Sequence, residues 1–210
     1  MDEILKYFPS LTDTQRRQFT ALRELYGTWN EKINVISRRD IDNLYVNHVL
    51  HSLSIARFIT PAPSTRFADL GCGGGFPGIP LAILWPECSF HLIDRIGKKV
   101  RVASEIAAAT GLDNCTFQHG DSGECREKFD YVVSRAVMTL PDLVKASAHM
   151  SDRKQNPLNR LPNGLICLKG GDLDSEIQAT PHSRDILQVP LSDFFDEEYF
   201  KTKSLIYVKL

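Results

Sequence analysis

The chain has 210 residues, of which 42% are hydrophobic and 24% charged, and its net charge is −1 at pH 7. These values are ordinary for a globular protein and suit one well-buried domain. They argue against an extended nucleic-acid-binding face, because such faces are usually strongly basic. No apolar run approaches the roughly 18 residues that a membrane helix needs, and the N-terminus lacks a signal-peptide core. We therefore expect a soluble cytoplasmic protein with no membrane partner, and we expect a monomer.

The five cysteines do not predict a disulfide framework or a metal site. Their number is odd, they include no Cys-x-x-Cys pair, and no histidine-rich cluster accompanies them. Most are expected to be small buried hydrophobic residues. Cys72 lies in a glycine-rich stretch, where its thiol could be reachable, although a structural role is favoured there too.

Residues 1–60 are expected to form a helical extension packed on a core of residues 61–210. A capping box begins at Thr12, and apolar residues then recur at helical spacing as far as about Asn30. A polar loop follows. A second helix is expected over residues 41–58, because apolar positions recur along it and two prolines then end it.

A strand, a tight turn and a helix are predicted over residues 67–84. A short apolar run contains the acid Asp69, and glycines follow at positions that include Gly71, Gly73 and Gly75. Glycine is required where the backbone takes a positive φ or closely approaches a ligand, and a proline, present after the glycines, suits the first turn of a helix. The turn is therefore predicted to hold a small molecule.

A second apolar run, residues 89–94, ends at Asp94. A carboxylate about 20 residues beyond a glycine turn can accept hydrogen bonds from ribose hydroxyls in a nucleotide-binding βαβ unit. Strand, turn, helix, strand and acid occur here in that order. The sequence therefore predicts a nucleoside-type ligand.

The nature of this ligand follows from charge. Residues 73–78, GGGFPG, satisfy the dinucleotide pattern G-x-G-x-x-G, so an NAD-binding oxidoreductase is one alternative. The bare amides at a helix N-terminus would favour the pyrophosphate of such a cofactor. The carboxylate of Asp69, just before the turn, would repel it. S-adenosylmethionine carries no phosphate, and its ammonium and sulfonium groups are cations. Acids at Asp69 and Asp94 therefore fit S-adenosylmethionine better.

The rest of the chain predicts a seven-stranded, mostly parallel sheet with an antiparallel edge, an α/β fold. A helix is expected to begin at Gly97 and end before Gly111, and another over residues 140–150. Residues 151–163 are polar and proline-bearing, which is typical of a surface loop. The five further strands are expected at 115–119, 129–136, 164–171, 186–189 and 204–208.

Two basic residues end predicted parallel strands, at the edge where such sheets bind ligands. Arg135 ends the fourth strand, and an arginine fork there could hold a phosphate or donate to guanine O6. The alternative is a strand-end arginine paired with an acid. Lys169 ends the fifth strand, where it could contact a phosphate or could be a solvated strand end.

Three stretches together resemble one protein family. They are residues 71–81 (GCGGGFPGIPL), 134–136 (SRA) and 29–34 (WNEKIN), which are similar to the RsmG (GidB) family of bacterial methyltransferases. The likeness covers nearly the whole chain. It implies a Rossmann-like class I methyltransferase that uses S-adenosylmethionine to modify N7 of a guanine in the decoding-region loop of 16S ribosomal RNA. The RNA partner is then free 16S rRNA, the small ribosomal subunit or an assembly intermediate.

The resemblance also implies site residues. Ser122 and Gly123, in the loop after the third strand, match the family's adenine-contacting pair, and the neighbouring Asp121 could bind the adenine amino group or cap a turn. Arg135 is expected at both the cofactor and the substrate, as the residue that positions the base. The full expected cofactor-binding set is Asp69, Gly71, Gly73, Gly75, Phe76, Asp94, Ser122, Gly123 and Arg135.

The substrate candidates are His48 and Lys169. His48 matches a family histidine that could contact RNA or hold its helix beside the ligand; a helix histidine bonded to backbone is the alternative. His51 stands where the family usually has an aspartate. Groups of basic residues could add a local RNA patch, but each is more typical of a solvated face: Arg16, Arg17 and Arg23; Lys32, Arg38 and Arg39; Lys98, Lys99 and Arg101; Arg153, Lys154 and Arg160.

The chemistry implied by the resemblance needs no general base. Guanine N7 carries a lone pair in the neutral base, so alignment of the reacting atoms can supply much of the rate. A site made of binding residues, with no metal, is therefore expected. Besides the oxidoreductase, a small-molecule methyltransferase and a non-catalytic nucleoside-binding protein remain alternatives.

Overall fold

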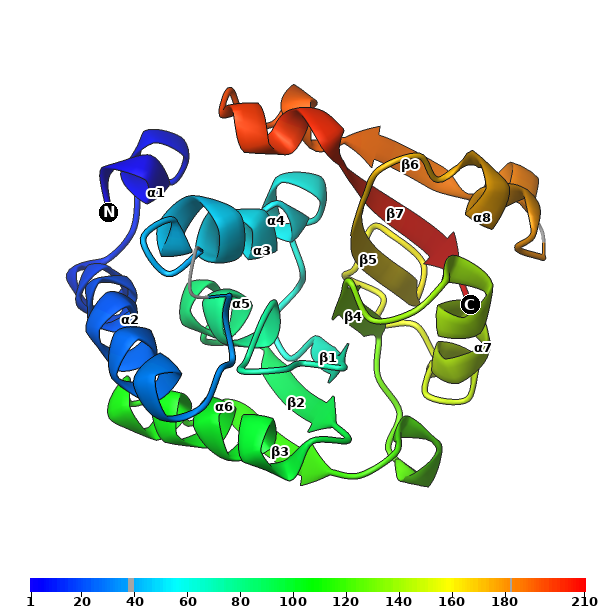
Figure 1. Ribbon diagram of the computed structural model, residues 1–210. Helices are drawn as coiled ribbons and strands as arrows, with labels where there is room; N and C mark the ends of the chain where they lie inside the picture. The colour runs from blue at the N-terminus through cyan, green and yellow to red at the C-terminus, as the bar shows by residue number, and fades with distance from the viewer. Residues whose placement is uncertain (38–39, 182) are drawn as a thin grey trace.

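A computed structural model describes residues 1–37, 40–181 and 183–210 (Figure 1). Its centre is one seven-stranded sheet in the order β3-β2-β1-β4-β5-β7-β6. The first five strands are mutually parallel, and β7 runs antiparallel to both β5 and β6. The strands are β1 (Arg66–Leu70), β2 (Ser89–Asp94), β3 (Cys115–His119), β4 (Tyr131–Arg135), β5 (Gly164–Gly170), β6 (Leu187–Pro190) and β7 (Lys203–Lys209). The predicted sheet and its antiparallel edge are confirmed.

Helices cover both faces of the sheet, and each face has its own hydrophobic cluster. The strands alternate between the clusters, because successive side chains of a strand point to opposite faces: Phe67 of β1 belongs to one cluster, Ala68 and Leu70 to the other. The helices within the sheet region are α5 (Gly78–Leu84), α6 (Gly97–Ala109), α7 (Leu140–Ala148) and α8 (Asp174–Gln178), with short 3-10 turns η2 (Ser122–Glu124), η3 (Ser183–Asp185), η4 (Leu191–Asp193) and η5 (Glu198–Thr202).

The N-terminal helices pack in the same cluster as α5 and α6. They are α1 (Asp2–Tyr7), α2 (Asp13–Lys32), the π-helical segment η1 (Leu44–Leu50), α3 (His51–Leu53) and α4 (Ile55–Phe58). The capping box is present, since Thr12 and Gln15 exchange side-chain and backbone hydrogen bonds. Figure 1 shows this part of the chain, in blue and cyan, beside α5 and α6. None of the described helices is both long and apolar enough to cross a membrane.

The sequence predicts one regular helix over residues 41–58, but the structure has three helical segments there. The helical region begins at Leu44, takes π-helical form and is interrupted at Ser54. The hydroxyl of Ser52 donates to the His48 carbonyl at 2.7 Å and that of Ser54 to the His51 carbonyl at 2.6 Å. Serine hydroxyls bonded back to carbonyls in this way bend helices, which accounts for the interruption at Ser54.

The segment expected to be a surface loop, residues 151–163, is partly buried. Asn159 is 5% exposed, and its Oδ1 accepts hydrogen bonds from the Ala62 amide at 2.8 Å and the Thr65 hydroxyl at 3.1 Å. This contact secures the segment that leads into β1, so the prediction of a loop on the surface is wrong for Asn159.

Two glycines of the N-terminal half provide a matched stability test. Gly71 has φ +72°, and a Cβ there would lie 2.5 Å from a methyl carbon of Val137. Gly27, inside α2, would meet nothing within 4 Å. We expect Gly71→Ala to lose more than about 1–2 kcal/mol of unfolding free energy, because it adds a steric clash to the cost of a left-handed alanine. We expect Gly27→Ala to gain up to about 1 kcal/mol.

Urea unfolding of the two variants measures both effects. The added substitution Val137→Ala is expected to recover part of the loss in Gly71→Ala, since it removes the two nearest methyl groups but leaves the strained backbone. Equal stabilities of Gly71→Ala and the unaltered protein would contradict the close approach of these two segments.

Candidate active site

The glycine turn between β1 and α5 is held from two directions. The amides of Gly71 and Cys72 both donate to the Ile93 carbonyl of β2, at 2.9 and 3.0 Å. From the N-terminal helix α2, the hydroxyl of the buried Tyr26 donates to the Gly74 carbonyl at 2.8 Å. Gly73 and Gly75 have positive φ values of 55° and 111°, so the turn takes the conformation for which its glycines are suited.

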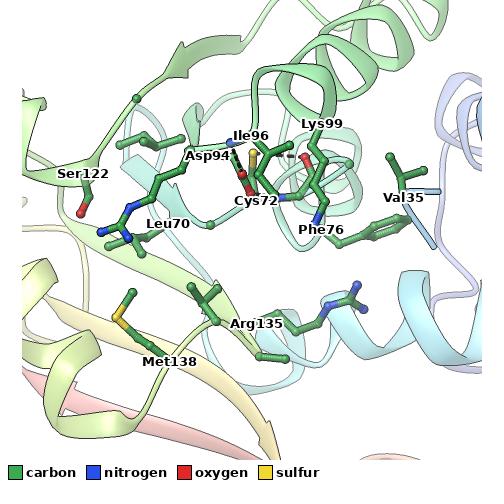
Figure 2. Close-up of a pocket in the computed structure, with 18 residues that line it drawn as sticks. Val35, Leu70, Cys72, Phe76, Asp94, Ile96, Lys99, Ser122, Arg135 and Met138 are labelled. Atoms are coloured by element: carbon green, nitrogen blue, oxygen red, sulfur yellow. Dashed lines mark hydrogen bonds between the residues drawn. The ribbon is translucent and has the colours of Figure 1, made fainter. Parts of the chain in front are cut away.

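A main cavity of about 590 Å³ opens beside this turn, at the carboxyl ends of β1, β2 and β4 (Figure 2). Of the expected cofactor residues, six line it: Gly71, Gly73, Phe76, Asp94, Ser122 and Arg135. The other three, Asp69, Gly75 and Gly123, are outside its lining. Sequence analysis missed several lining residues, among them Val35 from the loop after α2 and Val137 after β4.

Asp94 joins the turn to the segment after β2. Its Oδ2 accepts from the Gly73 amide and its Oδ1 from the Ile96 amide, both at 2.8 Å. In Figure 2 these bonds orient the carboxylate along the cavity wall. A carboxylate has about four lone-pair sites, so Asp94 retains capacity to accept further hydrogen bonds, as ribose hydroxyls require.

Asp69 lies beneath the turn and is fully buried. Its Oδ2 accepts from the Gly78 amide at 2.7 Å, and its Oδ1 has no partner among the described residues. Burial raises the pKa of this carboxyl to about 7, against the opposing effect of the Gly78 bond. Asp69 therefore fixes the start of α5 instead of forming the cavity surface.

The guanidinium of Arg135 has only neutral hydrogen-bond partners. Its Nη1 donates to the Asn47 carbonyl at 3.2 Å and its Nη2 to His48 Nδ1 at 2.9 Å. It also lies 5.0 Å from the ring centre of Phe76, which stacks on Tyr26 at 4.7 Å. Burial lowers the arginine's pKa. Residues 1–37, 40–181 and 183–210 provide no carboxylate in ion-pair contact with Arg135, so the expected alternative of a paired arginine is wrong.

A second cavity, of about 260 Å³, lies on the other side of Arg135. It shares Arg135 and Ala136 with the main cavity. Ala136 has φ +52°, a left-handed conformation that is uncommon for residues other than glycine. The remaining lining residues come from η1, α3, the ends of β5 and β7, and neighbouring loops: Asp40, Asn47, His48, His51, Leu168, Lys169, Gly170, Tyr199 and Lys203.

Lys169 lines the second cavity, but its amine forms hydrogen bonds with other residues of the protein. Its Nζ donates to the Met138 carbonyl at 2.8 Å and to Glu176 at 2.6 Å, and its side chain is 10% exposed. The same Glu176 oxygen accepts from the Leu140 amide at 2.7 Å. The alternative of a solvated strand end is wrong, and only one of the three N–H donors of Nζ remains for a contact with RNA.

The loop after β3 is organised by Asp121. Its Oδ1 accepts from the Gly123 amide at 2.8 Å and its Oδ2 pairs with Arg95 at 2.5 Å. These bonds correspond to the turn-capping alternative for Asp121, and they leave the Gly123 amide already bonded. The Ser122 carbonyl accepts from His149 Nε2 at 3.0 Å.

Two further expectations concern cysteine and basic residues. Cys72 lies at the wall of the main cavity but is 1% exposed, and burial raises the pKa of its thiol well above the usual range, which agrees with the favoured structural role. No group of three or more metal-ligating side chains occurs in the described part of the chain. Arg38 and Arg39, named above as part of a basic group, lie outside the described residues.

The buried carboxyl of Asp69 predicts a pH-dependent stability. Its folded pKa of about 7 lies above the unfolded value of about 4, so the folded protein holds a proton between these values that the unfolded chain has lost. The contribution of Asp69 to the free energy of unfolding therefore falls by on the order of a few kcal/mol as the pH rises from about 4 to 7. Above pH 7 this contribution no longer changes.

Asp69→Asn retains an oxygen for the Gly78 amide and cannot titrate. We expect the stability of the unaltered protein relative to Asp69→Asn, measured by urea unfolding, to decrease between pH 5 and pH 8. A difference that does not change with pH would contradict a protonated Asp69.

Solved structures with a similar fold include methyltransferases. A ribosomal protein L11 methylase from Lactobacillus delbrueckii subsp. bulgaricus matches with a TM-score of 0.57 and 18% identity, over 76% of each chain. A mutant of MtNAS in complex with S-adenosylmethionine matches with a TM-score of 0.56 and 11% identity, over 93% of this chain and 76% of that one. At these identities the likeness concerns the fold alone, and it confirms the expected class I methyltransferase fold.

Sequence relatives extend along the whole chain. A protein named Ribosomal RNA small subunit methyltransferase G from Bacteroides thetaiotaomicron is 57% identical over 210 residues, which are 100% of both chains. One of the same name from Porphyromonas gingivalis is 55% identical over 207 residues, 99% of this chain and 92% of that one. A family model described as GidB, rRNA small subunit methyltransferase G, matches residues 15–194. The resemblance seen in the motifs is thereby confirmed, and the chain belongs to the rRNA small subunit methyltransferase G (GidB) family.

Proposed function

We propose that the chain binds S-adenosylmethionine in the main cavity and transfers its methyl group to N7 of a guanine in the decoding-region loop of 16S rRNA. Family membership supports an rRNA methyltransferase. The proposal places the cofactor in one cavity and the base in the other. It depends on the observation that Arg135 and Ala136 belong to the walls of both cavities. A methyl donor in the main cavity and a base in the second cavity would meet at these two residues.

The residues of the main cavity fit S-adenosylmethionine. Asp94 has lone pairs left for ribose hydroxyls. Ile96 and Val137, which are 42% and 39% exposed, line the cavity, and their apolar side chains suit the faces of an adenine ring. Bound there, S-adenosylmethionine would supply an electrophilic methyl group.

Arg135 is the residue we assign to the base. Its charge is balanced by no ion pair among the described residues, and a guanidinium can donate to guanine O6 or to a phosphate. Its neighbour His48 is neutral, because burial and the arginine lower the pKa of His48 to about 3. Neither group needs to remove a proton, since N7 of neutral guanine already carries a lone pair. Alignment supplies the acceleration.

Methyl transfer from labelled S-adenosylmethionine to small ribosomal subunits from a strain lacking the modification tests this proposal. We expect label in N7-methylguanosine of 16S rRNA and a loss of roughly two orders of magnitude in kcat/KM for Arg135→Ala, because a charged donor at the reacting centre is removed. Arg135→Lys should retain part of the activity, since it keeps the charge without the planar fork. Arg126→Ala, at an exposed arginine outside both cavities, is the matched control.

Free 16S rRNA and assembly intermediates, used as substrates in the same assay, distinguish the three forms of the partner. Label in a different nucleoside would overturn the N7 assignment while leaving a ribosomal RNA methyltransferase. Transfer to a small molecule with none to RNA would favour the small-molecule alternative, and binding of NAD instead of S-adenosylmethionine would favour an oxidoreductase.

The Lys169–Glu176 pair predicts an indirect effect on cofactor binding. Lys169 and Glu176 together hold the Met138 carbonyl and the Leu140 amide, and Met138 lines the main cavity. We expect Glu176→Gln to weaken S-adenosylmethionine binding severalfold with little change in kcat. The substitution would displace the wall of the main cavity at Met138, whereas Arg135 would stay in place. Calorimetric titration of the cofactor measures the change.

The exposed pair Lys201–Glu198 is the matched control, with side chains 62% and 83% exposed. Because exposed pairs contribute little, Glu198→Gln should leave cofactor affinity unchanged. A cofactor affinity in Glu176→Gln equal to that of Glu198→Gln would contradict a positioning role for the partly buried Lys169–Glu176 pair.

A further inference from the structure

Lys99 is a cation in the wall of the main cavity without a partner of opposite charge. It belongs to the first turn of α6, lines the cavity and is partly buried. Its amine forms no hydrogen bond or ion pair among the described residues, whereas Arg95, in the same wall, pairs with Asp121 at 2.5 Å. The charge of Lys99 is therefore not neutralised within the described part of the chain.

This charge lies towards the glycine turn. Lys99 acts on the buried thiol of Cys72, whose pKa it lowers against the larger effect of burial. Figure 2 shows Lys99 on the side of the cavity where Cys72 and Phe76 lie, whereas Ser122 is on the opposite side, beyond Asp94. The main cavity thus has one end at Ser122 and a second end beside the glycine turn, and Lys99 belongs to the second end.

The proposed cofactor would extend from the first end to the second. Its adenine would lie near the loop after β3 and its ribose at Asp94. Its methionine part would continue towards Arg135 and Ala136, because the methyl group has to reach the wall shared with the second cavity. Phe76, which lies against the guanidinium of Arg135, belongs to the same end as Lys99. The amino-acid group of the cofactor would therefore lie at the end where Lys99 is.

The charges of S-adenosylmethionine restrict what an unpaired lysine can do there. The carboxylate is the one anionic group of this ligand, since its ammonium and sulfonium groups are cations. A nearby lysine repels both cations and attracts the carboxylate, and the partly buried setting strengthens these effects relative to bulk water. Lys99 therefore favours binding of this ligand only if the carboxylate is the group nearest to it.

The backbone of the glycine turn offers few donors to a carboxylate. Most of its amides are already bonded within the protein: those of Gly71, Cys72, Gly73, Gly75 and Phe76. The amide of Gly78, at the start of α5, donates to Asp69. A carboxylate at this end of the cavity therefore depends on a cationic side chain.

Arg135 is the other cation of the main cavity without an ion pair among the described residues, and it is less suited to this carboxylate. Its Nη1 and Nη2 already donate to the Asn47 carbonyl and to His48, which directs the guanidinium towards the N-terminal helices. The amine of Lys99 has three N–H donors, and none of them is used among the described residues.

We propose that Lys99 binds the carboxylate of S-adenosylmethionine, its ammonium group donating to the carboxylate oxygens. This rests on the proposed function, because it concerns the ligand proposed for the main cavity. With this contact the cavity would select cofactor forms that retain the carboxylate.

Calorimetric titration of the full chain with S-adenosylmethionine and with decarboxylated S-adenosylmethionine tests the proposal. The second ligand keeps the adenosine, the sulfonium, the methyl and the amino group, and lacks only the carboxylate. We expect Lys99→Met to weaken S-adenosylmethionine binding at least about tenfold, because a hydrogen bond between charged groups is lost. Affinity for the decarboxylated ligand should be unchanged or higher, since a repelling cation has gone. Retained binding of this ligand also reports an intact cavity.

Lys98→Met is the matched control. Lys98 precedes Lys99 in α6, is exposed and lies outside both cavities, so its loss should leave both affinities unchanged. Lys99→Arg should keep most of the preference for the carboxylate, since it keeps the charge. Equal weakening of both ligands in Lys99→Met, or weakening of neither, would overturn the proposal. The same holds if the preference is lost in Arg135→Ala but not in Lys99→Met.

RNA binding by the same variants tests the other anion that Lys99 could hold, a phosphate of RNA. If Lys99→Met keeps its affinity for S-adenosylmethionine but binds RNA more weakly, with a salt dependence reduced by about one phosphate contact, Lys99 serves the RNA and the proposal is overturned.

Failure of this proposal is separable from failure of the proposed function. A protein that shows the expected preference for the carboxylate but transfers no methyl group to RNA supports the role of Lys99 and overturns the proposed substrate. A protein that methylates RNA and binds both ligands equally overturns the role of Lys99 alone. A protein that does not bind S-adenosylmethionine overturns both proposals.

Discussion

The positions of both cavities depend on a half-buried arginine held without a counter-ion among the described residues. Taking a cation out of water is costly unless its hydrogen-bonding capacity is used. Arg135 meets this cost with the Asn47 carbonyl, the His48 lone pair and the face of Phe76. These partners come from η1 and from the glycine turn, so the end of β4, the N-terminal helices and the cofactor-side turn are fixed relative to one another through one side chain. This set of partners contains no acid, so the positive charge of Arg135 is not neutralised by an ion pair within the described residues.

The N-terminal extension is consequently part of the site. Tyr26 of α2 bonds to the glycine turn and stacks on Phe76, Val35 lines the main cavity, and η1 supplies two partners of Arg135. The division into residues 1–60 and 61–210, predicted from composition and helix pattern, separates a helical region from a sheet region. The boundary does not divide the candidate site, because side chains from both regions belong to one hydrophobic cluster and line the same two cavities.

The sequence predicted what is encoded locally. The strand, turn and helix around Asp69 and the position of Asp94 follow from short-range pattern, and the structure has both. It could not predict pairings between distant segments. The contact of Lys169 with Glu176, and that of Tyr199 with Asn47 across 152 positions, arise only when β5, α8, η5 and η1 are brought together. For that reason Asp69 was assigned to the cofactor-binding residues, where the fold instead buries it under the turn. For the same reason neither alternative for Lys169, an RNA phosphate contact or a solvated strand end, anticipated its pairing with Glu176.

Neutral histidines suit this site better than charged ones would. A protonated His48 would put a second cation against Arg135 and would lose the lone pair that the guanidinium uses. Burial prevents that protonation, so His48 keeps its lone pair for Arg135 and adds no charge beside the second cavity. The proposed reaction at guanine N7 needs no proton transfer from the enzyme, so a neutral His48 is compatible with it.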